Sequence, residues 1–149
     1  SYQVFDYLRV GPDVSLIFDD IAYMRLFHRE RISTKVTLQN TIYRHLFNQR
    51  LFGNDPDVFL LRDDNIQLTK EQKEALITIN ALFGSVLMTS DDIATYDEEK
   101  KKILSHALDL FYKGKVVNVK TNHHLIDIDY EVDNKTHHIT YNTKKGVLI

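Results

Sequence analysis

Short apolar runs recur along the first part of the chain, and turn-forming residues follow them. Residues 4–10 are rich in β-branched and aromatic side chains and lead into a Gly-Pro dipeptide, so we predict a buried strand that ends in a turn. Residues 50–53 and 86–89 have a similar character and predict two more short strands. The run 58–61 is apolar throughout, and its pattern is compatible with either a strand or a buried helical segment.

Apolar residues at helical spacing separate these runs and predict four helices. Two of the helices begin with a capping box, in which Thr69 is followed by Gln72 and Thr95 by Glu98, and each of these two ends at a glycine. The expected helical spans are 14–30, 33–48 (capped by Ser33 or Thr34), 69–84 and 95–114.

The last part of the chain changes to an alternation with a period of two. Ile126, Ile128 and Tyr130 share one face of a predicted strand, whereas Asp127 and Asp129 share the other face. We therefore expect an α/β chain in which repeated strand–helix units precede a small antiparallel β module. The strands predicted in this module are 115–120, 123–132, 136–142 and 147–149.

The composition is that of one ordinary folded domain, with 149 residues of which 43% are hydrophobic and 27% charged. The net charge is −2 and lysine and arginine form no cluster, which argues against nucleic-acid and membrane partners. No apolar stretch approaches the roughly 20 residues of a membrane span. The absence of cysteine excludes disulfides, thiolate metal sites and a cysteine nucleophile. The chain begins with neither an initiator Met nor a secretory leader, so we expect a cut start and a cytoplasmic location.

Three polar clusters follow predicted strands, where a strand–helix barrel carries its functional side chains. They are Arg9 with Asp13, residues 54–57, and residues 90–92. Each cluster also has a structural interpretation. Asp13 can cap the helix predicted to follow it, Asn-Asp-Pro-Asp at 54–57 is good turn chemistry, and 90–92 can supply cap and turn residues. For 90–92 we prefer the structural interpretation.

Two pairs of adjacent histidines, 123–124 and 137–138, raise the question of a metal site. Neighbouring residues on a strand point to opposite faces, so neither pair can bind a metal ion from one side. A cross-strand pair could do so, but we favour solvent-facing histidines and predict no metal site. The chain has no glycine-rich phosphate loop and no Ser-His-Asp order, and we predict no cofactor.

Four segments carry a more specific signal when they are taken in order. They are Tyr-Leu-Arg-Val-Gly-Pro-Asp at 7–13, Asn-Asp-Pro-Asp-Val at 54–58, Leu-Thr at 68–69 and Met-Thr-Ser-Asp-Asp-Ile at 88–93. Together they resemble the melibiase-type α-galactosidases, a family of retaining glycoside hydrolases, and they are most similar to its bacterial family-36-like branch. The resemblance extends over residues 4–112, and the tail looks like the antiparallel C-terminal domain of that family.

The resemblance implies a (β/α)8 barrel and a role for four residues. Asp13, on the loop after the sixth barrel strand, would be the general acid/base. Arg9 would be the cation beside the carboxylates and the sugar hydroxyls. Asp57, just past the seventh strand, would help to shape the sugar pocket, with Val58 as its apolar neighbour. A retaining glycosidase also needs a second carboxyl about 5 Å from the acid/base, which acts as the nucleophile.

The family carries its nucleophilic Asp after the fourth barrel strand, and this chain starts around the sixth. Residues 1–113 would therefore be the last three strand–helix units of the barrel, and 114–149 would be the antiparallel C-terminal domain. We expect part of an enzyme that removes terminal α-galactosyl residues from oligosaccharides, and we expect no turnover by these residues alone. Related activities of the same clan, on α-N-acetylgalactosaminides or by galactosyl transfer, stay open.

These expectations extend to partners. The ligand of the complete enzyme would be an α-galactoside sugar. An open partial barrel exposes apolar strand edges, so we expect the chain either to form a homo-oligomer or to cover the edges with its own tail. The alternative from another functional class is a non-catalytic carbohydrate-binding or interaction module.

Overall fold

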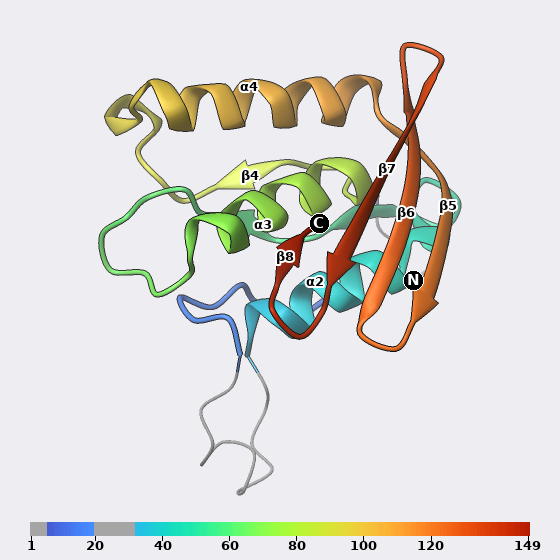
Figure 1. Ribbon diagram of the computed structural model, residues 1–149, viewed down its shortest axis with the longest axis horizontal. Helices are drawn as coiled ribbons and strands as arrows, with labels where there is room; N and C mark the ends of the chain where they lie inside the picture. Colours follow the sequence, from blue (N-terminus) through green and yellow to red (C-terminus); the bar gives the residue numbers. More distant parts are fainter. Residues whose placement is uncertain (1–5, 20–31) are drawn as a thin grey trace, which may run out of the picture.

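The computed structural model describes residues 6–19 and 32–149. These residues form a mixed α/β fold, in which two short parallel strand pairs and three α-helices precede a four-stranded antiparallel sheet. Figure 1 shows the three helices lying one above another, with the long strands of the antiparallel sheet crossing them at one end. The helix predicted over 14–30 is wrong in its first part, since 14–19 are not helical, and its other residues lie outside the described part of the chain.

Tertiary hydrogen bonds explain why no helix begins after Asp13. Val14 donates its backbone N–H to the Asp57 carboxylate at 2.6 Å, and Ser15 donates to the hydroxyl of Thr34 at 3.2 Å. The Thr34 hydroxyl in turn donates to the carbonyl of Ser15 at 2.8 Å. Distant side chains therefore satisfy the backbone groups of Val14 and Ser15 in a non-helical conformation.

The predicted helices after residue 32 are confirmed with small shifts at their ends. Ser33 caps the first of them, because its hydroxyl accepts the N–H of Val36 at 3.2 Å. Thr69 and Gln72 form the predicted capping box, and Gly84 is the C-cap of the same helix. The helical elements are α2 (Thr34–Tyr43), the 3₁₀ turn η1 (His45–Phe47), α3 (Lys70–Phe83), the 3₁₀ turn η2 (Ile93–Thr95) and α4 (Glu98–Lys113).

The N-cap of α4 differs from the prediction. Asp97 caps the helix by accepting the N–H of Lys100 at 2.9 Å, so Thr95 and Glu98 form no capping box. The Thr95 hydroxyl instead donates to the carbonyl of Asp92 at 2.7 Å and closes η2. A carboxylate at the N-cap also interacts favourably with the helix dipole, which explains why Asp97 takes this place. Within 6–19 and 32–149, none of the helices combines the length and apolar character that crossing a bilayer requires.

Two parallel strand pairs alternate with the helices. β1 (Tyr7–Arg9) pairs with β2 (Gly53–Asp55), and β3 (Val58–Phe59) pairs with β4 (Met88–Thr89). Only two residues separate β2 from β3, so one stretch of chain pairs with β1 through its first half and with β4 through its second half. Helix α2 lies in the chain between β1 and β2, and α3 lies between β3 and β4. This is the strand–helix alternation predicted from the sequence.

The strand predicted at 50–53 is displaced toward the C-terminus. Gln49 has a φ of 58° and donates its N–H to the carbonyl of Phe52 at 2.9 Å, so the residues before Gly53 form a turn. Gly53 begins β2 beneath the ring of Tyr7, where a Cβ would lie 2.6 Å from the ring carbon Cδ1. The strand therefore extends into the Asn-Asp-Pro-Asp motif, for which a turn was one of the interpretations that the sequence left open.

The antiparallel sheet agrees closely with its prediction. Ile126, Ile128 and Tyr130 are buried, as their shared face predicts. His123 and His124 form a turn instead of starting a strand, since His123 adopts a φ of 52°. The strands, which pair in sequence order, are β5 (Lys115–Asn122), β6 (Leu125–Val132), β7 (Lys135–Asn142) and β8 (Val147–Leu148).

The sheet and the helices share one hydrophobic core. Leu38 of α2, Leu76 of α3, Leu110 of α4 and Ile128 of β6 are each 2% exposed or less, and all but Leu110 are fully buried. Burying a side chain of this size contributes roughly 1.5–3 kcal/mol, so the tail and the helices stabilise each other. The tail therefore packs on the helices. The prediction that it covers exposed strand edges is not met in the described residues, because no strand of the tail pairs with β1, β2, β3 or β4.

The parallel strands are covered less completely. Tyr7 on β1 is 57% exposed, and Met88 on β4 is 39% exposed. In the part of the chain that the structure describes, no further strand pairs with the free edge of β1 or of β4. The parallel strands thus leave open edges of the kind that another strand can cover.

Candidate functional site

Parallel pairing brings the ends of β1 and β2 together. Arg9, the last residue of β1, lies opposite Asp55, the last residue of β2, in the strand register. Asp13 and Asp57 lie on the segments that follow these strands. The carboxyl ends of parallel strands share one edge of a sheet, and ligand sites of α/β proteins are found there. We call Arg9, Asp13, Asp55 and Asp57 the strand-end cluster.

Arg9 holds the strand-end cluster together. Its Nε donates to Asp55 Oδ2 at 3.0 Å, and its Nη1 donates to Asp13 Oδ1 at 2.9 Å. The same Nη1 lies 3.0 Å from Asp57 Oδ1. A single guanidinium thus contacts three carboxylates, which it can do because its N–H groups form a rigid planar fork.

The carboxylates keep Arg9 in its charged form. Partial burial opposes the charge, but the hydrogen bond from Arg9 to Asp55 and the negative charges of the three carboxylates outweigh this effect and raise the pKa of Arg9 above its ordinary value. With three carboxylates around one cation, the cluster has an excess of acidic groups.

Asp57 is the most buried carboxylate of the cluster, with 10% of its side chain exposed. Its backbone φ of 75° lies in the left-handed region, which Asp adopts more readily than most residues. The Asp57 N–H donates to Asp55 Oδ1 at 2.9 Å, and Asn80 Nδ2 donates to the Asp57 carbonyl at 3.3 Å. Asp57 Oδ2 accepts the N–H of Val14 at 2.6 Å. The turn at Asp57 is therefore anchored to β2, to α3 and to the segment after β1.

Asp13 is the exposed carboxylate of the cluster, with 75% of its side chain accessible. The sequence left open whether Asp13 caps a helix, but the residues directly after it are not helical, so no helix begins there for it to cap. The Asp13 carbonyl accepts the hydroxyl of Thr37 at 3.2 Å, which ties its backbone to α2. Asp13 thus combines an anchored backbone with an accessible carboxyl group.

The structure thus brings three of the four predicted site residues into contact, namely Arg9, Asp13 and Asp57. Val58 follows Asp57 directly, begins β3 and is half-buried opposite Met88 in the strand register. Asp55 belongs to the candidate cluster 54–57, but the sequence predicted no role for it. The contact between Asp55 and Arg9 depends on the register between β1 and β2, and this register is known only once the two strands are seen to pair.

Residues 90–92 have the structural role that the sequence analysis preferred. The Asp91 side chain is 1% exposed and accepts the N–H of Arg62 at 3.0 Å and the hydroxyl of Tyr96 at 2.7 Å. Burial and this hydrogen bond to Asp91 raise the pKa of Tyr96 far above its ordinary value. Asp92 accepts the N–H of Ala94 and caps η2. This segment therefore holds the loop after β3 against the loop after β4.

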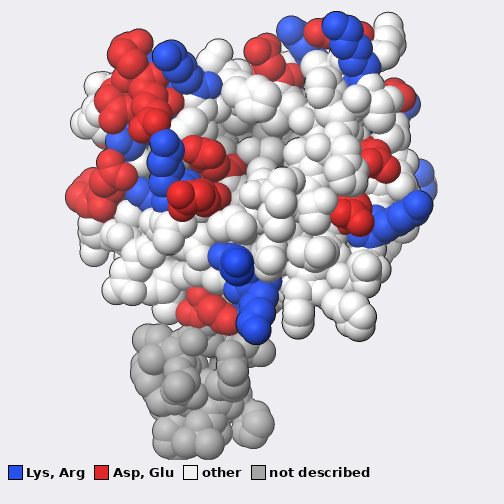
Figure 2. Space-filling view, viewed as in Figure 1, with Lys and Arg blue, Asp and Glu red and all other residues white. Residues whose placement is uncertain are grey.

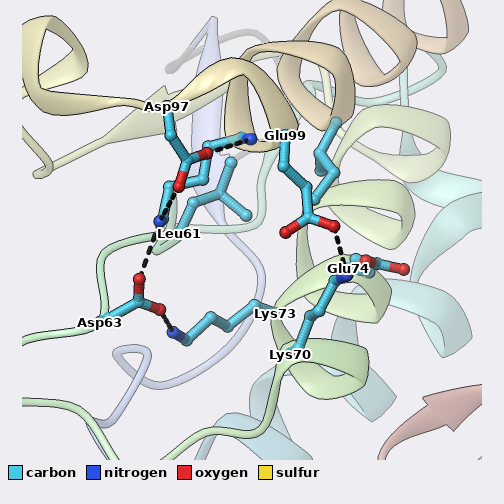
Figure 3. Close-up of a pocket in the computed structure, with 9 residues that line it drawn as sticks. Leu61, Asp63, Lys70, Lys73, Glu74, Asp97 and Glu99 are labelled. Atoms are coloured by element: carbon cyan, nitrogen blue, oxygen red, sulfur yellow. Dashed lines mark hydrogen bonds and ion pairs between the residues drawn. The ribbon is translucent and has the colours of Figure 1, made fainter.

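A second charged cluster lines a pocket of about 150 Å³ between the loop after β3 and the first turns of α3 and α4. Asp63 lies 2.8 Å from the Lys73 ammonium and 2.7 Å from the Lys100 ammonium. Figure 3 shows Lys73 pointing toward Asp63. The hydrogen bonds from Lys100 and Lys73 lower the pKa of Asp63 to about 2. We call this region the helix-start pocket. Its lining residues are Leu61, Asp63, Lys70, Lys73, Glu74, Asp97, Glu99, Lys100 and Ile103.

Each lysine of the helix-start pocket contacts at least one carboxylate. Lys100 also lies 3.0 Å from Asp97, and Lys70 lies 2.6 Å from Glu99. Figure 2 shows side chains of both charges gathered at the end of the molecule where α4 begins. The two charges alternate in space, so this arrangement is typical of a solvated salt-bridge network.

The histidine pairs do not form a metal site in the described residues. His138 Nδ1 lies 2.7 Å from Asp129 Oδ1, while His123 and His124 occupy the turn between β5 and β6. Within 6–19 and 32–149, no group of three or more His, Asp or Glu side chains is arranged to hold a metal ion.

Comparison with known proteins finds a similar fold in a solved structure. No protein-family model matches the chain. The structure is similar to an α-galactosidase from Thermus thermophilus that was solved in complex with p-nitrophenyl α-D-galactopyranoside, with a TM-score of 0.55 and 23% sequence identity. The match covers 91% of this chain and 26% of the α-galactosidase chain, so this chain spans about a quarter of the length of that enzyme. The mixed α/β arrangement, with its antiparallel sheet, is therefore one that occurs within a glycoside hydrolase.

Proposed function

We propose that these 149 residues are the C-terminal part of a retaining glycoside hydrolase that removes terminal α-galactosyl groups. The observation that carries the proposal is the strand-end cluster, in which one arginine contacts three carboxylates at the carboxyl ends of two parallel strands. The likeness to the Thermus α-galactosidase supports the same origin, because it covers most of the chain.

In this proposal residues 1–113 are the last three strand–helix units of a (β/α)8 barrel, and 114–149 are the antiparallel domain that follows it. Two parallel pairs with intervening helices support the barrel assignment. A complete barrel needs about 250 residues, so other strands have to complete it. The open edges of β1 and β4 are where those strands would pair.

The residues of the cluster divide the chemistry between them. Asp13, as general acid, protonates the glycosidic oxygen while a nucleophilic carboxylate attacks the anomeric carbon and the leaving group departs. In the second step Asp13 takes a proton from a water molecule, which displaces the carboxylate from the sugar and restores the enzyme with retention. Arg9 orients these groups and the sugar hydroxyls, and Asp57 with Val58 shapes the pocket.

The contacts within the cluster support a nucleophile outside these residues. Arg9 and the Val14 N–H occupy the two oxygens of Asp57. Arg9 and the Asp57 N–H occupy the two oxygens of Asp55. Contacts of this kind hold Asp55 and Asp57 in place within the protein. In this proposal the catalytic partner of Asp13 is therefore a carboxylate of the barrel strands that lie outside this sequence.

The proposal is tested with a chromogenic aryl α-galactoside. We expect no detectable hydrolysis by the 149 residues alone, and hydrolysis by the polypeptide or complex that also contains the missing strands. Turnover by the 149 residues at a rate near that of the complete enzyme would place the nucleophile within this sequence and contradict the proposed division.

The same samples separate the enzyme from a non-catalytic carbohydrate-binding module. A binding module would take up galactose as the isolated 149 residues, whereas an incomplete barrel lacks most of its sugar pocket. Equilibrium dialysis with labelled galactose is therefore expected to give weak binding at most. A cytoplasmic location and homo-oligomer formation stay predictions of the sequence.

A further inference from the structure

Asp55 contacts two other members of the strand-end cluster at once. Its Oδ2 accepts the Nε–H of Arg9 at 3.0 Å, and its Oδ1 accepts the backbone N–H of Asp57 at 2.9 Å. The side chain is 20% exposed, and Arg9 lies directly opposite it in the parallel register. Both carboxylate oxygens are therefore used inside the protein, at the point where β1 and β2 end.

The contact with Arg9 controls the direction of the guanidinium. Arg9 uses one nitrogen, Nη1, for both Asp13 and Asp57. Because the guanidinium is planar, the Nε bond to Asp55 fixes the plane in which Nη1 lies. Without that bond the guanidinium can rotate about the bonds of its long, partly exposed side chain. The direction of the contact between Arg9 Nη1 and Asp13 is then no longer fixed.

The contact with Asp57 controls the backbone next to Asp13. A bond from an Asp side chain to the N–H two residues on stabilises a tight turn, and here that turn gives Asp57 its positive φ of 75°. The turn directs Asp57 Oδ2 to the N–H of Val14, the residue directly after Asp13. Asp55 is thus connected to Asp13 by one route through Arg9 and by a second route through Asp57 and Val14.

We infer that Asp55 is a positioning residue that sets the orientation of the acid/base Asp13. The inference rests on the proposed function, and it adds a residue to which neither the sequence motif nor the fold comparison gives a role. A group that transfers a proton works only at the right distance and angle from the glycosidic oxygen. A misplacement of the catalytic carboxyl group by about 1 Å can lower the rate on the order of 100-fold. Asp55 therefore affects catalysis through its contacts with Arg9 and Asp57, although it does not touch the sugar.

The main test is Asp55→Asn in the complete, active enzyme. An Asn side chain keeps one oxygen for the Asp57 N–H but presents an amide group to Arg9 Nε, so two donors face each other. We expect kcat to fall about 10- to 100-fold with a smaller change in KM. Asp92→Asn is the matched control. It removes the same charge from another loop, and an Asn side chain can cap η2 as Asp92 does. We expect its kcat to stay within about twofold of the wild type.

A double-mutant cycle separates positioning from a purely structural role. Arg9→Lys keeps the cation but cannot contact three carboxylates, so the route through Arg9 is already lost in that variant. Adding Asp55→Asn to the Arg9→Lys variant is therefore expected to lower kcat by a clearly smaller factor than Asp55→Asn does in the wild type. The effects of two substitutions within one hydrogen-bond network are not additive in free energy. The inference would be overturned if the two decreases in kcat multiply in the double variant, or if Asp55→Asn alone keeps the wild-type kcat.

A direct measurement follows Arg9 itself. In a sample labelled with ¹⁵N, the Arg9 Nε–H signal is expected to exchange slowly with water in the wild type and in Asp92→Asn, and rapidly in Asp55→Asn. An unchanged exchange rate in Asp55→Asn would overturn the inference whatever the assay shows. A wild-type enzyme that does not hydrolyse α-galactosides contradicts the proposed function, so the two failures are distinguishable.

Discussion

The strand-end cluster and the helix-start pocket are both built from aspartates and long cationic side chains, but they differ in balance and burial. In the strand-end cluster one arginine contacts three carboxylates, and Asp57 is only 10% exposed. In the helix-start pocket Asp63 is 74% exposed and contacts two lysines. In the pocket three lysines are thus shared among the carboxylates, whereas in the cluster one cation serves three carboxylates, of which Asp55 and Asp57 are largely buried and Asp13 is exposed.

This difference indicates where chemistry can occur. Matched, exposed ion pairs contribute about 0–1 kcal/mol each and can form wherever opposite charges meet on a surface. Three carboxylates around one cation repel one another, and the fold has to hold them in place. Groups of like charge held together are more frequent at functional sites, so we expect the strand-end cluster, and not the helix-start pocket, to carry the chemistry.

The largest expected effect is the loss of turnover in Asp13→Asn of the complete enzyme. Asn occupies the same space but cannot give and take the proton, so we expect kcat to fall about 10²- to 10⁴-fold while sugar binding is retained. Turnover is measured with an aryl α-galactoside and binding by calorimetry. Asp63→Asn in the helix-start pocket is the matched control and should turn over normally. Normal turnover by Asp13→Asn would remove Asp13 from the acid/base role.

A smaller effect is expected on stability when the cation of the strand-end cluster is removed. In Arg9→Met the carboxylate of Asp57 stays buried without its positive partner and faces Asp55. Because Arg9 itself is partly exposed, we expect a loss of about 1–3 kcal/mol in the free energy of unfolding. Urea denaturation at neutral pH measures this loss. An unchanged free energy of unfolding would mean that water screens the cluster as fully as it screens the helix-start pocket.

The corresponding change in the helix-start pocket is Lys73→Met, and its effect is expected to be smaller. The Lys73 ammonium donates to the carbonyl of Arg62 at 2.6 Å and contacts Asp63. Removing it leaves Asp63 in contact with water and also removes the cost of burying an ammonium group. We expect the free energy of unfolding to change by less than about 1 kcal/mol. A larger loss than in Arg9→Met would reverse the comparison between the two regions.

The smallest effect is a pH dependence that originates in Asp63. Its pKa in the folded protein is lowered to about 2, from an ordinary value of 3.8. The paired carboxylate therefore stabilises the fold above pH 3.8, and this contribution is lost as the pH falls toward 2. Melting temperatures of the wild type and of Asp63→Asn should converge slightly over that interval. Because Asp63 is exposed, high salt is expected to remove the difference, and a salt-independent difference would contradict a screened surface pair.

Local signals in the sequence predicted the individual elements well. The capping box of Thr69 and Gln72 identified the start of α3, because it is made by residues three positions apart. The alternation in β6 predicted the burial of Ile126 and Ile128, because successive side chains of a strand face opposite ways. Predictions failed where a distant partner competes with the local pattern, as at Val14, whose N–H binds Asp57.

The candidate site was predictable in part. The motifs identified Arg9, Asp13 and Asp57, and these three side chains are in contact. The motifs gave Asp55 no role of its own, because Asn-Asp-Pro-Asp was also compatible with a plain turn. In the structure the first two residues of that motif belong to β2, and the pairing of β2 with β1 directs Asp55 to Arg9. A turn assignment hides this contact, since it leaves the strand register undefined.

The sequence by itself determined the helices, the alternating strands and the chemical groups available at the strand ends. These depend on periodicity, capping and residue type, which act over a few neighbouring positions. Only the tertiary structure decided that Asp55 fixes Arg9 and that Asp57 binds the backbone next to Asp13. Arg9 and Asp55 are 46 positions apart, and what brings them together is the parallel pairing of β1 with β2, the two strands that α2 connects. A contact of that range depends on the whole fold, so no local pattern contains it.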